Sequence, residues 1–136
     1  MFEYHGWITV RATAAATDAD DDLEAERLPG IVGALRAHLA AVDSPYLADL
    51  RFMNGQAFLH VGGFSNHRSD PDIKDLFLYV AELAPGSYGL LHTLDDEAPG
   101  HENEVRVLRL ARGELSAHRE PLLSPVIPAL EDPYSP

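Results

Sequence analysis

Two polar segments of the sequence contain the residue types of a hydrolytic site. Asn66-His67-Arg68 offers a base and a cation, and Asp95-Asp96-Glu97 offers three carboxylates. General acid–base catalysis would require these groups to meet in one concave pocket within hydrogen-bond reach. The sequence has no G-x-S-x-G motif, no phosphate-binding glycine loop and no other nucleophile motif. A small enzyme of unknown reaction therefore stays an alternative, and its residues would be His67, Arg68, Asp95 and Asp96.

The histidines and the acidic run near residue 20 lack the spacing of a metal site. The seven histidines, at positions 5, 38, 60, 67, 92, 101 and 118, form no H-x-x-x-H or H-x-H pattern. The run Asp18-Ala19-Asp20-Asp21-Asp22 lacks the central glycine and the terminal glutamate of a calcium loop. The chain has no cysteine, which excludes thiol catalysis and thiolate ligands. The sequence thus predicts no metal and no cofactor.

Charge is the most informative bulk property of the chain. Asp and Glu number 22 against 10 Lys and Arg, a net charge of −12. Such a field repels nucleic-acid phosphates and attracts basic proteins, although solubility alone would also explain it. There is no signal-peptide pattern, and no apolar stretch approaches the ~18 residues of a membrane span. The chain is therefore predicted to be cytoplasmic, with a protein partner and no membrane or nucleic-acid contact.

Strand patterns are clear in two places. Residues 2–11 alternate between apolar and polar types, which predicts a half-buried strand with Trp7 as an aromatic residue on the polar face. Asn54-Gly55, between two apolar runs, predicts a hairpin with a type I′ turn. In that register Leu50 opposes Leu59, and the apolar residues of both strands fall on one face.

Helical periodicity also occurs twice. Apolar residues recur at three- to four-residue steps over 28–42. Because proline inside a helix costs ~3 kcal/mol, Pro29-Gly30 favours a short acidic turn followed by a main helix over 29–41, with a longer kinked helix as the alternative. The second helix is predicted to begin with Asp70 as N-cap and Pro71 as its first residue, and to end at Pro85-Gly86.

The remaining segments are predicted as loops, strands and a tail. Residues 62–68 are expected to be a loop, and strands are expected over 87–93 and 104–112. In the latter strand the alternation slips at Val107-Leu108, which indicates a bulge or burial of both faces. Residues 112–114 could turn into a short sixth strand. The tail, 120–136, has five prolines among apolar residues and is expected to run extended and to pack on the body.

The order β-α-β-β-α-β-β predicts one α+β domain, residues 1–136, with two helices on one face of a mainly antiparallel sheet. The first six elements match a split βαβ arrangement. Trp7, on the other face, would then either anchor a binding partner or be covered by the tail.

Several short phrases occur in a fixed order along almost the whole chain. They are Phe2–Ile8, Asn66–Arg68, Ala84–Leu91, Asp95–Glu97, Leu110–Gly113, Leu123–Pro125 and Glu131-Asp132. Together they resemble the immunity protein seven family of bacterial polymorphic-toxin systems. The Ala-rich stretch 12–16 and Pro29-Gly30 depart from that family's pattern.

The resemblance implies an α+β domain, not an enzyme, that binds and neutralises a toxin in the cytoplasm of the producing cell. The implied partner is a cognate toxin, expected to be basic, with a nuclease as one option. The acidic segments 18–26 and 95–97 would steer the encounter, and Trp7 and Arg68 would be the anchors. The candidate partner-binding residues are Trp7, His67, Arg68, Asp95, Asp96 and Glu97. A homodimeric scaffold that pairs through a sheet edge remains a further interpretation, and the oligomeric state stays open.

Overall fold

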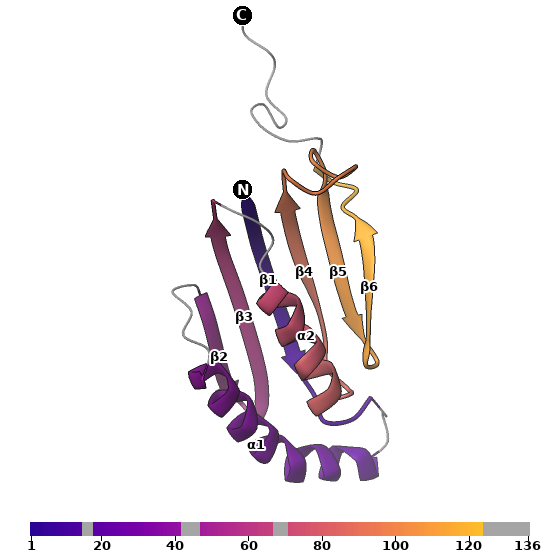
Figure 1. Cartoon of the computed structure of the whole chain (residues 1–136). Helices are drawn as coiled ribbons and strands as arrows, with labels where there is room; N and C mark the ends of the chain where they lie inside the picture. The colour runs from indigo at the N-terminus through magenta and orange to yellow at the C-terminus, as the bar shows by residue number, and fades with distance from the viewer. Residues whose placement is uncertain (15–17, 42–46, 67–70, 124–136) are drawn as a thin grey trace, which may run out of the picture.

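The computed structural model describes residues 1–14, 18–41, 47–66 and 71–123, and within them six strands and two helices (Figure 1). The strands are β1 (Phe2–Val10), β2 (Leu47–Met53), β3 (Gln56–Ser65), β4 (Tyr88–Asp95), β5 (Val105–Ala111) and β6 (Glu114–Arg119). The helices are α1 (Asp18–Ala41) and α2 (Pro71–Leu83).

The described strands form one antiparallel sheet in the order β2-β3-β1-β4-β5-β6. Its first four strands have the predicted split arrangement, in which β1 lies between β3 and β4. Both described helices cover the same face of this sheet (Figure 1). The α+β prediction is confirmed, with β6 as the added strand. The face without helices is called the open face below.

The core lies between the helices and the sheet. The even-numbered side chains of β1 point to this side, and Phe2, Tyr4, Ile8 and Val10 are almost fully buried there. Helix α2 contributes residues of its predicted apolar stripe, including the fully buried Phe77. Burial of such side chains removes apolar surface from water and is the main force that holds the helices on the sheet.

Helix α1 runs through Pro29, so the predicted short turn and helix over 29–41 were wrong, and the longer helix is the one formed. Pro29 and Gly30 are exposed, so water can satisfy the carbonyl group that has lost its N–H partner. Leu28 and Val32, on either side, are buried in the core. Their packing holds both halves of the helix on the sheet, and Figure 1 shows α1 bending along its length.

The β2–β3 hairpin has the predicted register, with Leu50 opposite Leu59, and Asn54 and Gly55 both have the positive φ of the predicted turn. Strand β3 nevertheless continues to Ser65, so the loop predicted from residue 62 was wrong. Gly63 pairs with Tyr4 of β1, and a side chain at Gly63 would come within 2.6 Å of the Tyr4 ring. In the sequence Gly63 predicts a loop. In the structure its lack of a side chain leaves room for the Tyr4 ring beside β3.

The second half of the chain follows the predicted elements closely. Helix α2 ends at Leu83, before Pro85-Gly86, whereas its predicted cap, Asp70, lies outside the described residues. Strand β5 pairs with β4 without interruption. The slip at Val107-Leu108 therefore reflects burial on both faces, since Val107 lies on the open face but is only 9% exposed. Arg112 and Gly113, both with positive φ, form the turn into β6.

Candidate functional site

The predicted site residues that the structure describes lie in different places. Trp7 lies on the open face, because β1 alternates and its even-numbered residues face the helices. Asp95 lines a cavity on the helix-covered side. Asp96 and Glu97 lie in the turn after β4. His67 and Arg68 lie outside the described residues.

The acidic turn after β4 is tied to the start of the chain. Asp96 Oδ1 accepts a hydrogen bond from the Met1 α-amine at 2.7 Å, and this bond raises the pKa of that amine above its usual value of 8.0. Asp95 Oδ1 accepts the Glu97 backbone N–H at 3.0 Å. The carboxylates of Asp95 and Asp96 thus stabilise the turn and fix its position at the surface.

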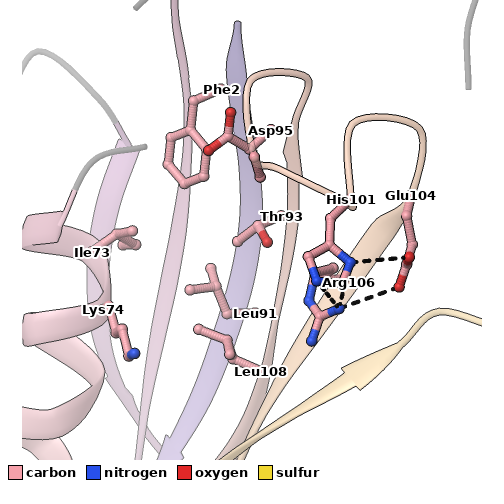
Figure 2. A pocket seen from close by; sticks show the side chains of 11 residues that line it. Phe2, Ile73, Lys74, Leu91, Thr93, Asp95, His101, Glu104, Arg106 and Leu108 are labelled. Carbon is pink, nitrogen blue, oxygen red and sulfur yellow. Dashed lines mark hydrogen bonds and ion pairs between the residues drawn. The ribbon is translucent and has the colours of Figure 1, made fainter. Parts of the chain in front are cut away.

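A cavity of about 310 Å³ opens between the start of α2 and strands β4 and β5 (Figure 2). Apolar side chains form much of its wall, and polar groups gather at one side. The labelled lining residues are Phe2, Ile73, Lys74, Leu91, Thr93, Asp95, His101, Glu104, Arg106 and Leu108.

Three of the polar groups that line this cavity bind one another. Arg106 donates through Nη1 to the His101 ring at 3.0 Å and to Glu104 Oε1 at 3.4 Å. His101 Nδ1 and Glu104 Oε2 are 3.3 Å apart. This cluster joins the β4–β5 loop to β5. The rest of the cavity wall is largely apolar, so the cavity is suited to holding an apolar group. Sequence reasoning missed it, although the i, i+3 and i, i+5 spacing of these residues was visible.

The enzyme alternative needs His67 and Arg68 to meet the carboxylates of Asp95 and Asp96 in one pocket. His67 and Arg68 lie outside the described residues, Asp95 lines the cavity, and Asp96 is paired with the Met1 amine. Among the described residues, no group of three or more His, Asp or Glu side chains could hold a metal ion. Nor does either described helix combine the length and hydropathy that a bilayer crossing needs.

The open face presents a second candidate site, centred on aromatic residues. Trp7 is 38% exposed and Tyr88 is 46% exposed, and their rings meet edge to face. In the β1–β4–β5 register, Trp7 is opposite Leu90, and Leu90 is opposite Arg109. Trp7, Tyr88 and Arg109 therefore come from three adjacent strands and share one surface, called the Trp7 surface below.

The Trp7 surface includes an exposed cation on this acidic chain. Arg109 is exposed and pairs with no carboxylate in the part of the chain that the structure describes. His60 of β3 lies opposite Trp7 and is also exposed. Trp, Tyr and Arg are the residue types most enriched at the energetic centres of protein interfaces. An exposed arrangement of all three can anchor a protein partner.

Comparison with known proteins gave one finding. The model of a protein family described as Immunity protein 7 matches residues 1–132. No curated protein and no solved structure matches the chain.

Proposed function

Because the chain belongs to the Immunity protein 7 family, we propose that it binds a cognate bacterial toxin and neutralises it by covering part of the toxin's surface. The observation that supports this mode of action is the Trp7 surface. Its rings are exposed yet held by contact with each other, so little side-chain freedom is lost when a partner binds.

We expect the partner to be a basic toxin that meets this chain in the cytoplasm of the producing cell. The net charge of −12 favours encounter with a basic protein, and a nuclease is one class of toxin with that charge. The exposed carboxylates of Asp21, Asp22 and Glu97 supply local negative charge for steering. Trp7 would then provide short-range contact after the encounter.

His67 and Arg68 remain proposed contacts. They precede α2 in the sequence, whereas Trp7 lies on the open face. Variants at Arg68 and Trp7, measured separately, test whether the toxin contacts each of these residues.

Inhibition by contact rather than catalysis is also part of the proposal. His101, Glu104 and Arg106 in the cavity beside α2 are engaged with one another, and the sequence has no nucleophile motif. The expected stoichiometry is one inhibitor to one toxin, and inhibition should follow occupancy rather than time. Progressive chemical change of the toxin by a small amount of this chain would contradict this part of the proposal.

The test is co-expression with the toxin encoded beside this gene. The chain should co-purify with that toxin, and adding it to the purified toxin should abolish toxin activity at equimolar concentration. An unrelated toxin of similar charge is the control for non-specific electrostatic binding. Full toxin activity in the presence of excess chain would overturn the proposal. The mass of the free chain tests the homodimer interpretation, in which β2 or β6, the edge strands of the described sheet, would pair.

A further inference from the structure

An open groove of about 600 Å³ lies between the two helices, on the side of the sheet that they cover. It is called the helix groove below. Figure 1 shows the C-terminal end of α2 approaching α1, and residues from both helices form the wall. The lining residues used below are Glu26, Gly30 and Ile31 of α1, Glu82 and Leu83 of α2, and Pro85.

Apolar side chains and carboxylates lie next to each other in this groove. Ile31 and Leu83, one from each helix, are partly buried and pack against the core. Glu26 and Glu82 are exposed, and neither forms an ion pair within the part of the chain that the structure describes. Arg27 also lines the groove but pairs with neither glutamate there. The groove therefore has an apolar floor between two available carboxylates.

Glu82 lies where a carboxylate lowers the stability of a helix. It is in the last turn of α2, which ends at Leu83, and that turn has no basic residue. The C-terminus of a helix carries a partial negative charge, so it repels a carboxylate and attracts a cation. The end of α2 thus adds to the negative charge of the two glutamates, and a cation in the groove would relieve the repulsion.

We propose that the helix groove receives a basic side chain of the toxin, an arginine or a lysine. Its aliphatic stem would lie on Ile31 and Leu83, and its charged head would lie between Glu26 and Glu82. Both basic side chains commonly bury the stem on apolar surface in this way and keep the head in polar surroundings. The inference rests on the proposed function for the identity of the partner.

The helix groove and the Trp7 surface lie at the same end of the sheet. Pro85 lines the groove, and Tyr88 of the Trp7 surface begins β4 directly after the turn that contains Pro85. Ala12, just beyond the end of β1, also lines the groove. A toxin bound at this end of the sheet is therefore close to both.

The first test fills the groove and removes no charge. A Cβ added at Gly30 meets no atom within 4 Å, and leucine is a better helix former than glycine. Gly30→Leu should therefore keep the thermal stability of the natural chain, while its complex with the toxin should dissociate ~10-fold faster. Gly33→Leu is the matched control, because Gly33 has the same open space in α1 and does not line the groove. Equal dissociation rates for these two variants would overturn the proposal.

The second test removes one carboxylate. Glu82→Gln should leave the free chain as stable or slightly more stable, because it removes a negative charge from the end of α2. Its complex with the toxin should nevertheless dissociate ~10-fold faster, since close contacts in a complex act mainly on the dissociation rate. Asp75→Asn is the matched control, an exposed carboxylate of α2 outside the groove. The proposal would be wrong if Glu82→Gln dissociated no faster than this control.

The third test needs no toxin, so it separates failure of the groove from failure of the proposed function. N-acetyl-arginine amide is titrated into the ¹⁵N-labelled chain at constant ionic strength, up to ~50 mM because one side chain binds weakly. N-acetyl-citrulline amide, which has nearly the same shape and no charge, is the control ligand. The amides of Ile31, Glu82 and Leu83 should shift with the arginine compound, and much less with the citrulline compound or in Gly30→Leu.

Equal shifts with the two compounds at these amides would overturn the proposal. If the arginine compound binds there but the natural chain does not bind the toxin, the groove is a site for basic side chains and the proposed function is wrong.

Discussion

Trp7 and Tyr88 meet edge to face on the open face, with ring centroids 6.1 Å apart and an interplanar angle of 89°. Tyr88 is opposite Thr9, so the two rings are diagonal neighbours across the β1–β4 pair. Aromatic pairs in this geometry contribute ~0.5–1.5 kcal/mol beyond the area they bury. The pair is therefore a fixed feature of the surface before any partner arrives.

Trp7→Ala is expected to weaken toxin binding at least ~30-fold, because truncation of a central anchor typically costs 2 kcal/mol or more. Isothermal titration with the purified toxin measures the change. Leu78→Ala is the matched control, since Leu78 is a comparably exposed apolar residue on α2. Equal losses for the two variants would remove Trp7 from the interface.

Removing charge from the turn after β4 is expected to slow toxin association several-fold at low salt and to weaken its salt dependence. The double variant Asp96→Asn, Glu97→Gln does this and keeps Asp95, whose carboxylate binds a backbone N–H of the turn. Stopped-flow association rates at two salt concentrations are the measurement. Asp75→Asn, Glu82→Gln removes the same charge from α2. If both variants slow association equally, net charge rather than this turn steers the toxin.

Glu24→Ala is expected to lower the free energy of unfolding by ~1–3 kcal/mol. The Glu24 carboxylate accepts the backbone N–H groups of Ala12, at 2.7 Å, and Thr13, at 3.2 Å, and lies 3.6 Å from the Arg11 guanidinium. Its loss removes this acceptor from two partly buried N–H groups. Urea unfolding measures the change. Glu26→Ala, an exposed position on the same helix, should stay within ~0.5 kcal/mol of the natural chain.

Gly89→Ala and Gly33→Ala are expected to change stability in opposite directions. A side chain at Gly89 would overlap the Trp7 carbonyl oxygen and come within 2.9 Å of Ile8 Cα, so β4 must move away from β1. We expect a loss above ~2 kcal/mol, with altered Trp7 fluorescence. Gly33 in α1 has open space around it, so alanine there should stabilise the chain by ~0.5–1 kcal/mol. A Gly89→Ala protein of natural stability would contradict the β1–β4 packing.

Glu102 is expected to make the β4–β5 loop sensitive to acid. Its carboxylate is bound by its own backbone N–H and by that of Gly100, at 3.1 Å, which lowers its pKa below the usual 4.5. The resulting stabilisation is present above pH 4.5 and is lost as the pH falls through the lowered pKa. Carboxyl NMR titration gives that pKa, and the protection factor of the Gly100 amide, which corrects for the intrinsic pH dependence of exchange, should fall over the same range. Glu102→Gln should abolish the pH dependence of that protection factor.

Local patterns in the sequence determined a large part of this fold. The alternation of β1, the Asn54-Gly55 hairpin register and the stop of α2 at Pro85-Gly86 all follow from side-chain period and turn chemistry, which act over a few residues. The family resemblance was visible in the same way, because it rests on short phrases in order. The match over residues 1–132 confirms it.

Tertiary structure decided what depends on distant partners. Pro29 alone predicts a break, but α1 continues through it because the residues on both sides pack on the core. Similarly, β3 continues through Gly63 because it pairs with β1. The Trp7 surface joins residues from three strands separated by some hundred positions in the chain, because the strand order places β1, β4 and β5 side by side. Alternation alone placed Trp7 opposite the core, but only the sheet register shows that Tyr88 and Arg109 lie beside it.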